Sequence, residues 1–155
     1  MRLYILRHAD ADTEAATDSA RTLSEKGQEQ ARKVAQFCHE EGIRPDVILA
    51  SPLIRAQQTA KPVAKELGAG LSTAPWLSCG ARPEVIVAAL SGLKNATEVM
   101  LVGHEPDLGE LIAHLLGAAA GGTIHVRKAS LTLVEVFDLR RGGGRLEWSL
   151  PARLM

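Results

Sequence analysis

Short apolar runs of strand length alternate along this chain with segments of helical periodicity, and this alternation limits the possible folds more than any other feature. The predicted strands cover residues 3–6, 47–50, 71–77, 99–102, 131–137 and 146–150. Strands that alternate with helices favour a parallel sheet, whereas the last two strands flank Gly142-Gly143-Gly144 and indicate an antiparallel hairpin. We therefore predict an α/β fold, a three-layer α/β/α sandwich on a mostly parallel mixed sheet with a C-terminal β-hairpin.

The helices are predicted from apolar spacings of three and four residues and from their flanking residues. The first is capped by Thr22 or Ser24 and ends near Gly42, and the others cover residues 52–67, 83–90 and 107–116. Pro62 lies inside the second helix, where a kink is expected because proline removes a backbone hydrogen bond.

Length and composition favour a single domain over residues 1–155, because 46% of this 155-residue chain is hydrophobic. The chain has 18 basic and 18 acidic residues, so no global charge favours nucleic acid or an anionic membrane. Cys38 and Cys79 fit neither a disulfide framework nor a zinc pattern. No secretory signal pattern or apolar stretch of membrane-spanning length is present, and we expect a cytoplasmic protein.

Basic residues follow three of the predicted strands. Arg7-His8 ends the first strand, Ser51 begins a segment that carries Arg55 after the second, and Gly103-His104 follows the strand over residues 99–102. Because the carboxyl ends of parallel strands lie at one edge of a sheet, we expect these side chains to meet in one pocket.

This set of residue types is suited to phosphoryl transfer, in which negative charge spreads over three equatorial oxygens. The planar forks of Arg7 and Arg55 can each donate two hydrogen bonds to such a group. A neutral imidazole can attack phosphorus and hold the phosphoryl group covalently, and we expect the nearby arginines to lower the pKa of His8. His104 can be charged once a phosphate dianion arrives and then help to bind it.

The same segments resemble the histidine phosphatase (phosphoglycerate mutase-like) superfamily. Its R-H-G motif matches residues 7–9, its S-x-x-x-R-A-x-x-T-A segment matches residues 51–60, and its G-H motif matches residues 103–104. The short chain, residues 18–23 and Cys79-Gly80 are most similar to the SixA-type phosphohistidine phosphatases.

The resemblance implies a role for each matching residue. His8 would be the catalytic nucleophile that becomes phosphorylated, and Arg7, Arg55 and His104 would complete the catalytic site by binding the phosphoryl group. Arg21 would be a fourth phosphate-binding residue. Ala9 replaces the usual glycine of the first motif, and because it adds only a methyl group we expect no loss of activity.

Larger members of the superfamily that hydrolyse phosphate esters have a carboxylic acid after the third strand, and residues 77–82 contain none. An alkoxide leaves poorly without a proton, whereas a phosphohistidine with a protonated ring can leave as neutral imidazole. The missing acid therefore favours a P–N substrate, and Glu84 is the carboxylate that could overturn this interpretation.

The predicted function is a metal-independent phosphohistidine phosphatase without a cofactor, which acts through phospho-His8 on a histidine-phosphorylated signalling or phosphocarrier protein. We expect a monomer that binds neither nucleic acid nor membrane. One alternative is a phosphomonoesterase of small metabolites with Glu84 as general acid, and another is a non-catalytic module that binds phosphohistidine.

Two other patterns are interpreted as coincidental. Asp10 and Asp12 lie near His8, but a metal ion there would lie against the positive charge of Arg7, so no metal site is predicted. Residues 38–44 fit the C-x5-R pattern of cysteine phosphatases, yet they lie at a predicted helix C-terminus, where backbone N–H groups cannot cradle a phosphate.

Overall fold

The computed structural model describes residues 1–118 and 124–155, and its centre is a six-stranded sheet in the order β3-β2-β4-β1-β5-β6. The strands are β1 (Arg2–Arg7), β2 (Val47–Ala50), β3 (Leu71–Thr73), β4 (Glu98–Gly103), β5 (Leu131–Val136) and β6 (Gly144–Leu150). β1 to β4 are parallel to one another, whereas β5 is antiparallel to both β1 and β6. The predicted mixed sheet with a C-terminal hairpin is therefore confirmed.

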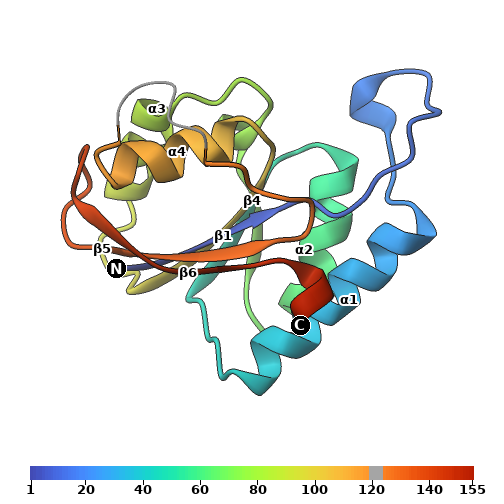
Figure 1. Cartoon of the computed structure of the whole chain (residues 1–155), viewed down its shortest axis with the longest axis horizontal. Coiled ribbons are helices and arrows are strands. Elements are labelled where there is room, and N and C mark those ends of the chain that lie inside the picture. The colour runs from blue at the N-terminus through green and yellow to red at the C-terminus, as the bar shows by residue number, and fades with distance from the viewer. Residues whose placement is uncertain (119–123) are drawn as a thin grey trace.

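Helices cover both faces of this sheet (Figure 1). They are α1 (Glu25–Glu40), α2 (Ile54–Leu67), α3 (Pro83–Ser91) and α4 (Asp107–Leu115). Neighbouring residues of β1 point to opposite faces, so Tyr4 packs in the core with α1 and α2 whereas Leu3 packs in the core with α3 and α4. The three-layer α/β/α arrangement is thus confirmed.

No helix within residues 1–118 or 124–155 combines the length and the apolar character needed to cross a membrane.

The structure decides between the two predicted caps of α1 and moves the predicted start of α2. Ser24, not Thr22, caps α1, because its side-chain oxygen accepts a hydrogen bond from the Gly27 N–H at 3.1 Å. α2 begins at Ile54, two residues later than predicted, and it continues through Pro62 to Leu67.

The predicted strand over residues 71–77 is wrong in its second half. β3 ends at Thr73, and Pro75–Leu77 form a 3-10 helix, η2. Proline cannot donate to a strand ladder but fits the first turn of a helix, so Pro75 ends the pairing. The strand predicted over residues 131–137 also stops one residue early, because Phe137 lies in the hairpin turn and donates its N–H to Gly143 O.

The start of α1 packs directly against the chain that follows β1. Ser24 N donates to Asp10 O at 3.2 Å, and a Cβ added to Gly27 would lie 1.9 Å from the same oxygen. Only glycine allows this approach. The first turn of α1 therefore fixes the backbone two residues after His8.

Candidate active site

The carboxyl ends of β1, β2 and β4 bring together the side chains that the motifs predicted. The rings of His8 and His104 have centroids 5.2 Å apart, and Arg55 Nε lies 3.3 Å from His8 Nε2. The His8 N–H donates to Gly103 O at 3.0 Å, which extends the pairing of β1 with β4 by one residue. This extra bond sets His8 beside His104.

The hydrogen bonds of His8 fix which ring nitrogen carries the proton. Nδ1 lies 2.8 Å from the carbonyl oxygen of Ala9, which can only accept, so Nδ1 is the protonated nitrogen of the neutral ring. Nε2 then carries the lone pair and accepts a hydrogen bond from the Nε–H of Arg55. The arrangement presents a nucleophilic nitrogen beside a guanidinium.

His8 is also held in its neutral form. Burial lowers its pKa to about 3, an effect that the hydrogen bond to Ala9 opposes and that the positive charges of His104, Arg55 and Arg7 reinforce. The predicted direction of this pKa shift is confirmed, but the main cause is burial of the ring rather than the arginines.

Arg55 comes from the first turn of α2 and is only 4% exposed. Thr59, one turn later, donates its hydroxyl to Arg55 O at 2.7 Å and accepts a hydrogen bond from Ala9 N at 3.0 Å. One threonine therefore ties the residue after His8 to the helix that carries Arg55.

His104 is buried at the end of β4. Its Nε2 lies 2.7 Å from Ser51 Oγ, and burial, followed by the charge of Arg55, lowers its pKa to about 4. Its Nδ1 has no hydrogen-bond partner among the described residues.

Arg7 is partly held by the loop before β5, where its Nη1 donates to Val126 O at 2.8 Å. Its Nε is buried and, like His104 Nδ1, lacks a partner within the part of the chain that the structure describes. Buried polar atoms are almost always hydrogen-bonded. Arg7 Nε and His104 Nδ1 are therefore unused groups at neighbouring strand ends, and among the described residues Glu105 Oε2 is a third such atom.

Arg21 does not contact His8. Its Nε donates to Asp12 O at 2.6 Å, and its Nη1 donates to Asp18 Oδ1 at 3.2 Å. The other carboxylate oxygen of Asp18 accepts from Arg55 Nη2 at 2.9 Å. Arg21 therefore reaches the site through a carboxylate that it shares with Arg55.

Asp18 is a site residue that the motifs did not predict. It lies in the 3-10 turn η1 (Asp18–Ala20), on the long segment between β1 and α1 that projects beyond the end of β1 (Figure 1). Hydrogen bonds from Arg55 and Arg21 hold its pKa below the usual range of an aspartate. Residues 18–23 contributed to the resemblance, but nothing in that segment indicated that the Asp18 side chain would reach Arg55.

Residues 79 and 80 form another wall of the site. Cys79 Sγ lies 3.6 Å from Arg55 Nη2, and burial raises the pKa of this thiol, so it is not a thiolate. Gly80 has a φ of +87° and donates its N–H to the buried Asp107 Oδ2 at 2.8 Å. Asp107 at the start of α4 thus fixes this wall.

Glu84 is far from His8. Its side chain is 70% exposed and lies 3.7 Å from His114, in the last turn of α4. His114 follows Asp107 by seven residues, which is about 10 Å along a helix. Because α4 starts at the pocket and runs away from it, the structure does not bring Glu84 to the site.

The carboxylate nearest to His8 in sequence has other partners. Asp10 accepts from Lys128 Nζ at 2.6 Å and from Ser24 Oγ at 2.8 Å. Within the described ranges, no three His, Cys, Asp or Glu residues are grouped so that they could hold a metal ion.

Cys38 of the C-x5-R pattern is buried in the core, and burial raises its pKa to about 12.

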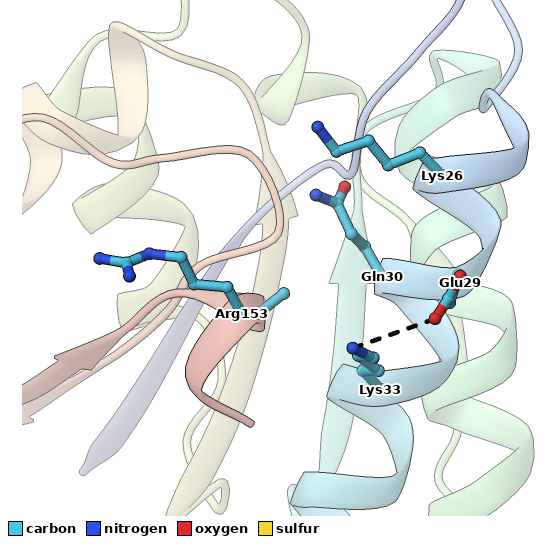
Figure 2. A pocket seen from close by; sticks show the side chains of 6 residues that line it. Lys26, Glu29, Gln30, Lys33 and Arg153 are labelled. Atoms are coloured by element: carbon cyan, nitrogen blue, oxygen red, sulfur yellow. Dashed lines mark ion pairs between the residues drawn. The ribbon is translucent and has the colours of Figure 1, made fainter.

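A separate hollow of about 210 Å³ lies between α1 and the C-terminal residues (Figure 2). Its lining contains none of the residues that the motifs predicted, and it consists of Lys26, Glu29, Gln30, Lys33, Ala152 and Arg153.

Comparisons with known proteins relate this chain to one superfamily. Residues 3–78 match the model of the histidine phosphatase superfamily, branch 1. The chain is 30% identical to the phosphohistidine phosphatase SixA homolog of Haemophilus influenzae, over 76% of this chain and 78% of that protein. It is 29% identical to the phosphohistidine phosphatase SixA of Escherichia coli, over 97% of this chain and 93% of that protein. The solved structure of the protein histidine phosphatase SixA complexed with tungstate is 27% identical, with a TM-score of 0.87 over 99% of both chains.

Proposed function

Because this chain belongs to the histidine phosphatase superfamily, we propose that it removes the phosphoryl group from a histidine-phosphorylated signalling or phosphocarrier protein. The observation that carries the proposal is the His8 ring, which is neutral, has its lone pair on Nε2 and lies 3.3 Å from Arg55 Nε. The similarity to proteins named phosphohistidine phosphatase supports the choice of substrate.

In the proposed reaction, His8 Nε2 attacks phosphorus and forms a new N–P bond. The P–N bond of the substrate breaks, and its electron pair returns to the ring nitrogen of the leaving histidine. Water then attacks the phosphorus of phospho-His8, and the Nε2–P bond breaks with its electron pair returning to Nε2. The released phosphate keeps both protons of the water, and the ring is neutral again. No metal or cofactor takes part in either step.

The basic residues supply the electrostatic part of this mechanism. Arg7 Nε and His104 Nδ1 are buried atoms free to hydrogen-bond an equatorial oxygen, and Arg55 already faces the attacking nitrogen. A phosphoryl dianion between these groups would raise the pKa of His104, so that its ring gains a second donor. Arg21 binds the phosphoryl group only if it leaves its present partners.

The positions of the acidic residues support a P–N substrate. Glu84 lies beside His114, away from the pocket, and hydrogen bonds from Arg55 and Arg21 hold the pKa of Asp18 below the usual range of an aspartate. Neither of these two carboxylates therefore offers a proton to the alkoxide of an ester. A phosphohistidine with a protonated ring leaves as neutral imidazole and needs no such acid.

A substrate panel tests the proposal. Purified protein is given a phosphohistidine peptide, 4-nitrophenyl phosphate and an alkyl phosphate, and phosphate release is measured for each. We expect fast turnover of the peptide, slow turnover of the nitrophenyl ester and almost none of the alkyl ester.

Glu84→Gln serves as the matched variant in this panel and should leave turnover of the peptide unchanged. Fast hydrolysis of the alkyl ester that collapses in Glu84→Gln would instead identify a metabolite phosphatase. Binding of the peptide without any turnover would identify a module that only recognises phosphohistidine.

A further inference from the structure

The carboxylate of Asp18 lies beside the proposed catalytic centre but is not needed for the attack on phosphorus. Arg55 links the two groups, because its Nε contacts His8 Nε2 at 3.3 Å while its Nη2 donates to Asp18 Oδ2 at 2.9 Å. A single guanidinium group thus separates the carboxylate from the nucleophilic nitrogen.

Asp18 is also held firmly on this side of the site. Arg21 donates to Oδ1 at 3.2 Å, and Arg55 Nη1 donates to the Asp18 backbone oxygen at 2.7 Å. These bonds favour the charged form, and the pKa of Asp18 is accordingly lowered. The group is therefore a fixed negative charge and not a proton donor.

The same carboxylate is open to a ligand. Its side chain is 61% exposed, and each oxygen accepts one hydrogen bond although it has two lone pairs. Because the carboxylate is exposed and shares Arg55 with His8, an N–H donor on a group bound at His8 can use one of these lone pairs.

We propose that Asp18 is a specificity-determining residue that recognises the protonated ring of the departing phosphohistidine, by accepting a hydrogen bond from the ring N–H remote from phosphorus. This inference rests on the proposed function. A protonated N-phosphorylated imidazole carries both the positive charge and the N–H that such a carboxylate prefers. An aryl or alkyl ester carries neither, and its leaving oxygen becomes negative, so Asp18 discriminates against it.

This recognition does not change which bonds form and break in the first step. The P–N bond breaks, its electron pair goes to the leaving nitrogen, and the remote N–H stays in place on the neutral imidazole. Because Asp18 holds this N–H before and after bond breaking, it acts chiefly on substrate binding. Its loss should therefore raise KM more than it lowers kcat.

The test compares Asp18→Asn with wild type on a phosphohistidine peptide and on 4-nitrophenyl phosphate. Asp12→Asn is the matched control, because it removes the same charge from the same exposed segment. A hydrogen bond to a charged partner predicts a fall in kcat/KM on the peptide of about tenfold or more in Asp18→Asn. Activity on the nitrophenyl ester should be unchanged or higher, and Asp12→Asn should match wild type on both substrates.

A pH profile supplies the readout that a structural role would not move. The advantage of wild type over Asp18→Asn on the peptide should shrink as pH rises through the pKa of the substrate ring, because the unprotonated ring lacks the remote N–H. If Asp18→Asn lowered kcat/KM equally on both substrates, Asp18 would only orient Arg55. If it raised kcat/KM equally on both, Asp18 would only compete with the phosphoryl group for Arg55. Either result overturns the inference. A wild-type protein that hydrolyses the ester but not the peptide would instead refute the proposed function itself.

Discussion

At the scale of single residues, burial and hydrogen bonding decide the state of the proposed nucleophile. The charged form of a buried ring loses its hydration, so a neutral ring is favoured even before nearby charges are considered. For His8 this effect outweighs the charges of His104, Arg55 and Arg7, and the bond from Nδ1 to Ala9 O leaves Nε2 with its lone pair. Neutrality and orientation therefore have separate causes.

The shape of the Arg55 side chain should matter as much as its charge. Arg55→Lys keeps the charge but removes the planar fork that contacts both His8 and Asp18. We expect kcat to fall on the order of a hundredfold or more, because a lysine lacks the planar fork that donates two hydrogen bonds to the phosphoryl group. Steady-state kinetics on a phosphohistidine peptide measure the effect.

Arg32→Lys is the control for Arg55→Lys, because Arg32 is exposed on α1. It should behave as wild type. If Arg55→Lys were equally active, the phosphoryl group would have to bind elsewhere.

At the scale of elements, hydrophobic patterning predicted which segments form strands and helices, and motif position predicted which strand ends meet. The error at residues 75–77 arose because the apolar run continues past Pro75, although the proline ends the ladder. The start of α2 at Ile54 shows a similar limit, since periodicity places a helix end only to within one or two residues.

The contacts that the sequence did not predict involve the backbone or a loop. Arg7 is held by the carbonyl of Val126, and any residue type provides a carbonyl. Asp18 reaches Arg55 because the segment between β1 and α1 brings it to the first turn of α2, and no local pattern encodes that path. For the same reason, Glu84 could be ruled out of the site only once α3 was placed against α4.

The contact between α1 and the chain after β1 predicts an unusual response to mutation. Gly→Ala inside a helix normally stabilises by about 1 kcal/mol. Gly27→Ala should instead destabilise the protein, because the new Cβ would lie 1.9 Å from Asp10 O and push the backbone that follows His8. Urea unfolding measures the loss in the free energy of unfolding, and kcat measures the effect on the site.

Gly70→Ala is the control for Gly27→Ala, because a Cβ at Gly70 meets nothing within 4 Å. It should leave stability and activity nearly unchanged. A Gly27→Ala variant as stable and active as wild type would show that α1 does not fix the site.

At the scale of the whole molecule, the buried histidines link the site to stability. His8 and His104 have folded pKa values of about 3 and about 4, below the ordinary value of 6.5. At a pH between the folded and the unfolded pKa of each histidine, the unfolded chain binds a proton that the folded protein does not. The free energy of unfolding therefore falls as pH falls below about 6.5. From pH 7 to pH 5 the loss should be about 2 kcal/mol for each of the two histidines.

Urea unfolding at pH 7 and pH 5 in phosphate-free buffer measures this loss. Carboxylates titrate mostly below this window, so the histidines dominate the difference. His8→Gln should show about half of the wild-type pH dependence, because His104 remains. Equal stability of the wild type at both pH values would contradict the buried, neutral state of these rings.

The central claim is that His8 carries the phosphoryl group, and rapid trapping with a phosphohistidine peptide labelled on phosphorus tests it most directly. Wild type should yield a labelled protein whose bond is labile in acid and stable in alkali, as a phosphohistidine is, and the label should map to His8. His8→Ala should show neither label nor turnover while its circular dichroism spectrum stays that of wild type. Normal turnover by His8→Ala, or a label that maps to another residue, would contradict the account.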